Sequence, residues 1–149
     1  MTALTLNQIL KRIETQATSH KQVAMYRQSV RADRFLPDAE YPLVFCVPGS
    51  IYISTNNSPT VNYRFYLGVC DRHLEDMSNL FEVLSDTSTI LIDIISLLRN
   101  EYFNDGAFDL QLNTTAEIFS ESDGDIVAGY GLEIEVITPF FDNTCDIPL

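Results

Sequence analysis

The sequence predicts an α+β domain, in which a short N-terminal helix and one long central helix pack on a mainly antiparallel sheet. Two patterns lead to this prediction. Apolar residues recur every three or four positions in two segments, and they alternate with a period of two in several others. The chain of 149 residues has the length of a single domain. We expect that domain to span residues 1–139, with a C-terminal arm over residues 140–149.

The first element is predicted to be a helix over residues 6–19. Thr5 and Gln8 have the spacing of a capping box, with Thr5 as the N-cap. Apolar residues follow at helical spacing. Those expected to be buried are Leu6, Ile9, Leu10 and Ile13. Those expected toward solvent or a partner are Lys11, Arg12 and Lys21.

A strand-rich block is predicted next. After a short strand within residues 22–30, the apolar run 42–47 ends at the turn dipeptide Pro48-Gly49. A short strand around residues 51–53 precedes a second cluster of turn residues, and residues 61–69 then alternate strictly between apolar and polar. The last three of these strands are expected to form an antiparallel meander.

The long helix is predicted over residues 74–100, and Asn104-Asp105-Gly106 stops it. Acidic residues near its start and Arg99 near its end suit the helix dipole. The apolar stripe expected to lie across the sheet is Met77, Leu80, Phe81, Leu84, Leu91, Ile94, Ile95 and Leu98. The acidic residues are Asp71, Glu75 and Asp76.

Two or three further strands close the domain. Residues 108–112 alternate, residues 114–119 can pair back, and residues 125–138 form a long strand that ends at Pro139. In the long strand, apolar residues 132, 134 and 136 share one face. Glu133 and Glu135 share the other.

The charge of the chain is strongly asymmetric. The net charge is −12 overall, and it runs from +4 over residues 1–34 through −5 over residues 35–99 to −11 over residues 100–149. This balance argues against nucleic-acid binding across the whole surface, which requires Lys and Arg at the phosphates. It suits a subunit whose basic part meets the acidic part of a neighbour. Two solvated faces are the alternative interpretation.

No pattern predicts catalysis, a metal or a cofactor, and we expect the protein not to be an enzyme. His20 and His73 lack a second ligand at metal-binding spacing. Cys46 and Cys70 fall in predicted strands and are interpreted as buried small residues. The acidic loop of Glu121, Asp123 and Asp125 lacks the order of a calcium loop and is interpreted as a solvated turn. No apolar run reaches the length of a membrane span and no signal peptide precedes the domain, so we expect synthesis in a cytosol.

Several short motifs resemble a small structural protein of tailed phages, known from crAss-like and other phages that infect Bacteroidetes. The motifs are Leu6-Asn7-Gln8-Ile9, Tyr41-Pro42, Pro48-Gly49-Ser50-Ile51, Glu82-Val83-Leu84-Ser85-Asp86, Gly124-Asp125-Ile126-Val127-Ala128-Gly129 and Cys145-Asp146-Ile147-Pro148. The order of elements is also similar to that of tail-terminator, or tail-completion, proteins. The chain departs from the pattern in the Asp71-Arg72-His73 link and in the arm from Phe140.

The resemblance implies a virion protein, made in the host bacterial cytoplasm, that forms a six- or twelve-fold ring at the head–tail junction or in the tail barrel. Expected partners are other neck and tail ring proteins, the portal or adaptor, and double-stranded DNA that passes without specific binding. No catalytic residue, cofactor or membrane is implied. A cytosolic adaptor or binding module outside the virion, and a small enzyme with an unrecognised site, remain alternatives.

Within such a ring, we expect two sets of residues to matter. An acidic channel wall repels phosphate and lets DNA slide, and the candidates for lining it are Asp123, Asp125, Glu133 and Glu135. Contacts between identical subunits in a ring join two different surfaces. The candidates for the subunit interface are Arg27, Arg31, Arg34, Phe140 and Phe141.

Overall fold

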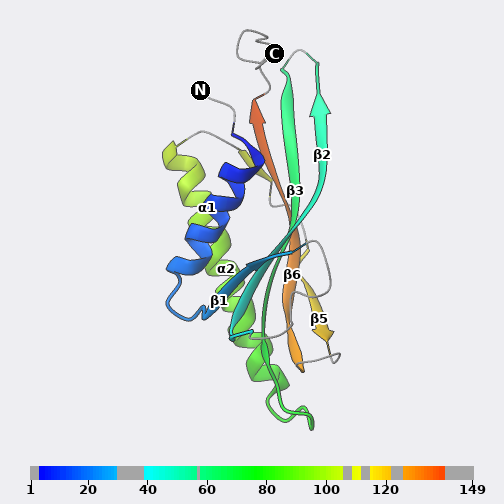
Figure 1. Cartoon of the computed structure of the whole chain (residues 1–149). Coiled ribbons are helices and arrows are strands. Elements are labelled where there is room, and N and C mark those ends of the chain that lie inside the picture. The colour runs from blue at the N-terminus through cyan, green and yellow to red at the C-terminus, as the bar shows by residue number, and fades with distance from the viewer. Residues whose placement is uncertain are drawn as a thin grey trace.

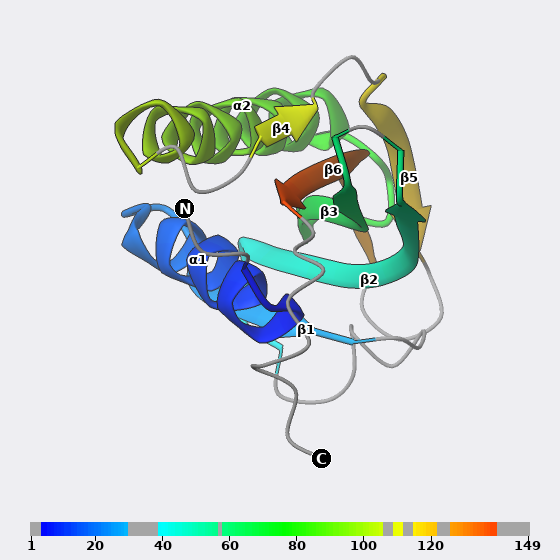
Figure 2. The same ribbon diagram turned by 90° about the horizontal axis from the view of Figure 1, so that it is seen from above.

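The computed structural model describes residues 4–29, 39–56, 58–105, 109–111, 115–121 and 126–139. It is an α+β fold with a mostly antiparallel six-stranded sheet, as predicted. The elements in chain order are α1 (Leu6–Ser19), β1 (Met25–Gln28), β2 (Leu43–Ser54), β3 (Thr60–Arg72), α2 (Leu80–Asp105), β4 (Asp109–Gln111), β5 (Glu117–Glu121) and β6 (Val127–Pro139). Both helices lie on one face of the sheet, and the described residues place no helix on the other, which we call the helix-free face (Figures 1 and 2).

The strand order is β1-β2-β3-β6-β4, and β5 also pairs with β6. The predicted meander is wrong. β2 and β3 form one long hairpin, β6 returns along the other side of β3, and β1 pairs with β2 in parallel. The pairing partner of a strand depends on residues distant in the chain, which the local alternation does not specify.

Pro48-Gly49 is a bulge in a continuous strand and not the predicted turn. Pro48 pairs with Phe65 and Ile51 with Tyr63, so Gly49 and Ser50 both stand opposite Arg64. A bulge of this kind bends a strand without ending it. Two short strands expected from the sequence are therefore one strand of 12 residues.

Helix α1 forms as predicted. The Thr5 hydroxyl accepts a hydrogen bond from the Gln8 amide at 3.2 Å, and the Gln8 side-chain oxygen accepts one from the Thr5 amide at 2.8 Å. Ile9 and Ile13 are buried, whereas Leu6 and Leu10 are only partly buried at the edge of the core.

Helix α2 begins at Leu80, six residues later than predicted. β3 keeps pairing with β6 as far as Arg72, and the next amide, of His73, donates to the carbonyl of Ile126 at 3.1 Å. The sheet thus holds the chain extended up to the residue before the predicted start of the helix, and a turn follows, in which the Met77 amide donates to the carbonyl of Leu74 at 2.9 Å. As a result Met77, in the left-handed backbone region with φ of 61°, stands in a connection and not in a helix. Asp71, Glu75 and Asp76 precede the helix as well.

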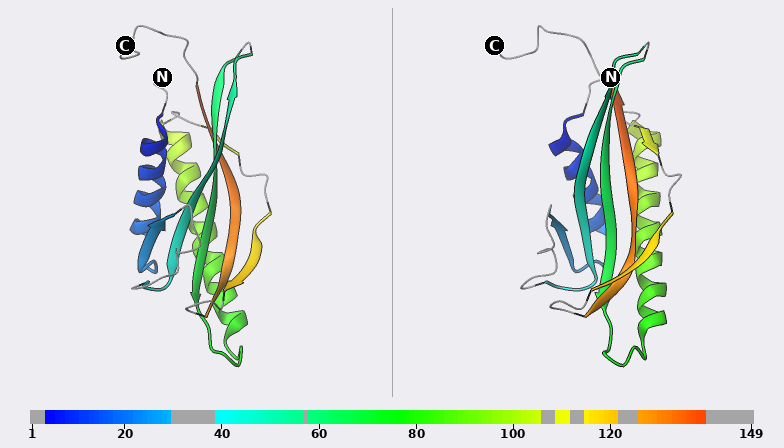
Figure 3. Two further views of the ribbon diagram at one scale, coloured as in Figure 1. Left: turned by 45° about the vertical axis from the view of Figure 1, so that its right-hand side comes forward. Right: turned by 90° about the vertical axis from the view of Figure 1, so that its right-hand side faces the viewer.

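The main core lies between the helices and the sheet. It includes Ile13 from α1, Ile94 from α2, and Leu67 and Ile134 from the central strands. Met77 and Phe81 do not join it, contrary to the predicted stripe, and are exposed to solvent. At this end of α2, Leu84 instead forms a separate small cluster with Val83 and with Ala128 of β6. Figure 3 shows the two helices stacked against the same face of the twisted sheet.

A second, smaller core lies on the helix-free face. Phe45 of β2 stacks on Tyr66 at 6.0 Å and meets Phe119 of β5 edge-on at 5.4 Å between ring centroids. Phe45 and Phe119 come from strands that β3 and β6 separate, so the sheet curls around this cluster. Gly68 and Gly131, which pair with each other, lie beneath the aromatic rings.

Candidate assembly surface

The described residues include three of the predicted site residues: Arg27, Glu133 and Glu135. The other predicted interface residues, Arg31, Arg34, Phe140 and Phe141, lie outside the described residues. The same holds for the predicted channel residues Asp123 and Asp125.

The three described residues share the helix-free face. Arg27 pairs in register with Phe45, whose ring belongs to the core on that face. Glu133 pairs with Tyr66, which packs against the same core, and Glu135 lies two residues further along β6. The predicted interface residue and the predicted channel residues therefore lie at opposite sides of one surface.

The two glutamates differ in their surroundings. A side-chain oxygen of Glu135 lies 3.7 Å from Nε of Arg64 and accepts a hydrogen bond of 2.8 Å from the Asn62 amide nitrogen. Its charge is thus largely compensated within the sheet. Glu133 is exposed to solvent. Of the two candidates for a channel wall, Glu133 is the more exposed to solvent.

The distal part of the β2–β3 hairpin extends past the ends of both helices (Figures 1 and 3). Ile51, Tyr52 and Ile53, which we call the hairpin patch, are 50%, 54% and 58% exposed. Ile51 and Ile53 pair with residues of the helix-side face, and Tyr52 pairs with Asn62 on the helix-free face. Both faces of the hairpin thus carry large apolar side chains in contact with solvent.

Among the described residues, no strand pairs with the outer edge of β2 over this length. β1 pairs with β2 only at residues 43–46, and beyond them no other described strand lies against that edge. We call residues 47–54 the free edge. Backbone donors and acceptors along an open edge are available to a further strand. Sequence reasoning missed the hairpin patch, because residues 51–53 have the composition of any half-buried strand.

A second apolar patch lies at the opposite end of the molecule. Leu74 and Met77 in the connection, and Phe81 in the first turn of α2, are 56%, 60% and 85% exposed. We call them the loop patch. Glu75 and Asp76 lie between Leu74 and Met77 in the sequence, and Glu82 directly follows Phe81, so the patch has acidic neighbours.

His20 and His73 make hydrogen-bond contacts within the fold, and Cys46 is buried. His20 Nε2 lies 3.0 Å from a carboxylate oxygen of Asp93 and so connects the end of α1 to α2. His73 Nδ1 lies 2.9 Å from the carbonyl oxygen of Leu74. Burial raises the pKa of the Cys46 thiol to about 12. A thiol held protonated in this way is a poor nucleophile.

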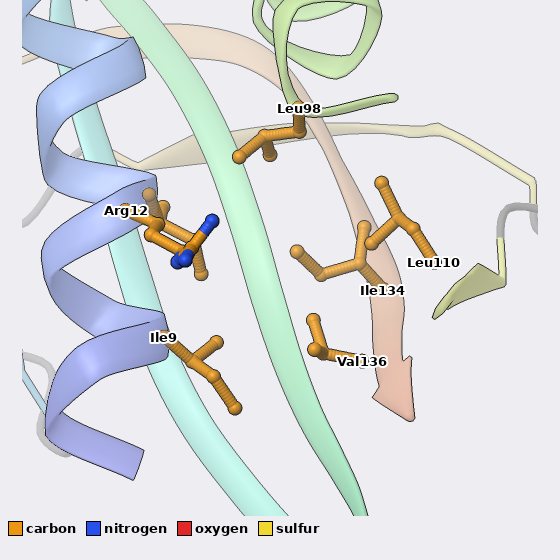
Figure 4. A pocket seen from close by; sticks show the side chains of 7 residues that line it. Ile9, Arg12, Leu98, Leu110, Ile134 and Val136 are labelled. Atoms are coloured by element: carbon orange, nitrogen blue, oxygen red, sulfur yellow. The ribbon is translucent and has the colours of Figure 1, made fainter. Parts of the chain in front are cut away.

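One cavity opens between the helices and the sheet. Its lining residues are Ile9, Arg12, Ile13, Leu98, Leu110, Ile134 and Val136 (Figure 4). Its lining contains no histidine, cysteine or acidic side chain. Among the described residues, no group of three histidine, cysteine or acidic side chains is placed to hold a metal ion.

These features define a class: a small α+β domain whose distinctive surfaces are an open strand edge and apolar ends. No family model and no curated protein match this chain. Within the described residues, neither helix combines the length and the apolar character required to cross a membrane.

Proposed function

We propose that the protein is a virion structural protein of a tailed phage, a subunit of an oligomeric ring at the head–tail junction or in the tail barrel. The ring connects the portal or adaptor to the tail and surrounds the DNA channel. The observation that supports this proposal most strongly is the free edge of β2 beside the hairpin patch.

An open, apolar strand edge is a liability in a protein that stays single, because it pairs with other chains indiscriminately. The free edge spans eight residues, and three consecutive large apolar side chains stand on it. A second copy of the chain that adds a strand there satisfies the backbone groups and buries the apolar side chains. When the added strand is a different segment of the neighbouring copy, the contact joins two different surfaces, and it forms a ring if its rotation closes around an axis.

The distribution of charge supports the same arrangement. The first 34 residues carry +4 and the last 50 carry −11, so contact between unlike regions of neighbouring copies is electrostatically favourable. Glu133 on the helix-free face contributes a carboxylate to a surface that repels DNA phosphates. Arg64 and Glu135 form a neutral pair on the same face.

The first experiment compares the wild type with the double variant Ile51→Lys, Ile53→Lys. Sedimentation velocity over a range of concentrations, together with electron microscopy of particles from the phage, reports whether rings form and where they lie. We expect rings for the wild type and folded single subunits for the variant. Ile92→Lys, at an equally exposed isoleucine on α2, is the matched control and should leave rings intact.

Two results contradict the proposal. One is a wild type that stays a single subunit at every concentration and is absent from the virion. The other is intact rings from the double hairpin variant. Charge reversal at Arg27, Arg31 and Arg34 should also weaken assembly while circular dichroism shows a folded domain.

The loop patch favours a second candidate function, a cytosolic binding module outside the virion. Phe81 is 85% exposed, and an aromatic side chain in that state is a common anchor in protein interfaces. A single subunit in solution that captures one partner, with loss of capture in Phe81→Ser, supports this function over the ring.

A further inference from the structure

The sheet has a second open edge, at β5. This strand pairs with β6 on one side, and no described strand pairs with its other side. Ile118 of β5 is 60% exposed. β5 therefore shares two features with the free edge of β2: an edge that a further strand can join, and a large apolar side chain in contact with solvent.

The hydrogen bonds of β2 show which of its backbone groups point outward. The Cys46 carbonyl accepts from the Ser29 amide at 3.2 Å, so the backbone groups of Cys46 face away from β3. These directions alternate along a strand, and Pro48, which has no N–H, falls on an outward position, where a strand tolerates proline. The bulge adds one residue, so the outward positions beyond it are Ile51 and Ile53.

The same alternation, followed through the registers of β3 and β6, gives the directions on β5. The backbone groups of Glu117, Phe119 and Glu121 point to β6. Those of Ile118 and Ser120 point away from it. The three pairings that lead from β2 to β5 are all antiparallel, so β5 runs in the direction opposite to β2. A copy added edge to edge in the same sense therefore continues an antiparallel sheet.

We propose that β5 of one copy pairs with the free edge of β2 in the next copy, antiparallel, with Ile118 opposite Ile53 and Ser120 opposite Ile51. In this register the outward backbone groups of the two strands face each other. Phe119 packs into the core of the helix-free face, so Ile118 lies on the helix-side face, as Ile51 and Ile53 do. The exposed isoleucines thus come together on one face of the joined sheet. The inference rests on the proposed ring and names the strand that joins its subunits.

The sequences of the two edges favour this pair over two copies of β5. β5 begins and ends with glutamate, and an antiparallel pair of β5 strands would place Glu117 opposite Glu121, which is destabilising. The free edge contains no charged residue, and Arg64 of β3 stands opposite its bulge. A register shifted by one residue would set Ile118 on the face opposite to Ile53 and misalign the backbone groups.

The pairing fixes how neighbouring copies are placed. Within one copy, Ile118 is level with Val44 of β2 through its pairing with Tyr130 and the pairing of Tyr130 with Val69. Ile53 lies nine positions further along β2, one of which is the bulge residue, so neighbours are offset by eight residues, roughly 26 Å along the strands. Such an offset tilts the strands relative to the axis of a closed ring, as in a barrel. β1 ends before the free edge begins and does not block it.

The test uses disulfide formation between copies of the full-length chain. A tagged variant Ile118→Cys, Cys145→Ser is mixed with an untagged variant Ile53→Cys, Cys145→Ser, and copper phenanthroline is added as the oxidant after assembly. Opposed residues of an antiparallel pair have Cα atoms about 4.5–5.5 Å apart, which a disulfide can span. Cys46 and Cys70 are buried, so a disulfide between tagged and untagged chains reports position 118 against position 53.

Two matched controls replace the untagged partner. Ile92→Cys, Cys145→Ser places the thiol on α2, at an isoleucine that is 64% exposed against 58% for Ile53. Ile51→Cys, Cys145→Ser places it two residues away on the same strand and tests the register.

We expect about tenfold more cross-linked heterodimer from position 53 than from position 92, because pairing raises the local thiol concentration, and less from position 51 than from position 53. Ser120→Pro gives a second measurement. It removes an outward N–H of β5 and spares the bonds to β6, so circular dichroism should show a folded domain and sedimentation should show single subunits. Ser120→Ala keeps the amide and should leave rings intact.

Equal yields from positions 53 and 92 within intact rings overturn the strand pair and leave the ring standing, and so do intact rings from Ser120→Pro. Disulfides that join position 53 to position 53 of another copy overturn it as well, because they show β2 paired with β2. An open filament that gives the disulfide between positions 53 and 118 supports the strand pair and removes the ring. A wild type that stays a single subunit at every concentration removes both proposals.

Discussion

Replacing Gly68 with alanine tests how the helix-free face of the sheet is packed. A Cβ atom on Gly68 would lie 2.2 Å from Cζ of Phe45 and within 2.8 Å of both Cε atoms of that ring. Phe45 is 1% exposed, and Tyr66 and Phe119 hold its ring from two sides. The ring therefore has no space into which it can move away.

The expected magnitude follows from this geometry. Inserting a methyl group into a packed core costs about 1–3 kcal/mol of unfolding free energy, and we expect Gly68→Ala near the upper end. Phe45→Ala should cost about 3–5 kcal/mol. Without the Phe45 ring the methyl group fits. Alanine then stabilises a strand relative to glycine by about 0.5–1 kcal/mol of unfolding free energy. The effect of Gly68→Ala thus changes by about 3–4 kcal/mol when Phe45 is replaced, and this change is the expected coupling.

Urea denaturation followed by far-ultraviolet circular dichroism measures the four free energies of the cycle. The chain contains no tryptophan and seven tyrosines, so tyrosine fluorescence is a second probe. If Phe45→Ala does not fold, Phe45→Leu gives the same cycle with smaller costs. Gly49→Ala is the control, because its Cβ would contact Arg64 and not Phe45.

Additivity within about 0.5 kcal/mol would refute the reasoning, because it would mean that the ring of Phe45 does not cover Gly68. A coupling of equal size between Phe45 and Gly49 would refute it too, since that result points to a general weakening of the sheet.

Two further predictions concern single side chains. Thr138→Val leaves the buried Leu4 amide without its acceptor and should lower the unfolding free energy by about 1–3 kcal/mol in urea denaturation. Thr138→Ser keeps the hydroxyl and should stay near the wild-type value. Equal losses in both variants would mean that the hydrogen bond contributes little. Burial raises the pKa of the Asp71 carboxyl, so the folded state binds that proton more tightly than the unfolded chain. The wild type therefore loses stability as the pH rises past the ordinary aspartate pKa of about 3.9. Asp71→Asn keeps an oxygen that accepts from the Arg72 amide. Its unfolding free energy in urea titrations should therefore rise relative to that of the wild type between pH 3 and 7. A difference between the two that does not change with pH would contradict this cause.

Part of the assembly surface was predictable from the sequence. The alternation in residues 125–138 places Glu133 and Glu135 opposite the core-facing side chains, and the structure confirms that placement. The free edge, the hairpin patch and the position of Arg12 in the cavity were not predictable. Each depends on which element lies beside another, and residues 51–53 have the same pattern whether a strand covers them or not.

Local structure follows from the amino-acid sequence alone in three places: the capping box that starts α1, the alternation that makes β3 and β6, and the opposite charges of the two ends of the chain. These features act within a few residues, so local spacing suffices to specify them. Three other features cannot be read from local patterns: β1 pairs in parallel, Pro48-Gly49 is a bulge, and α2 begins at Leu80. These features depend on contacts between segments distant in the chain, because a backbone amide or carbonyl pairs with whichever neighbouring segment the fold brings beside it.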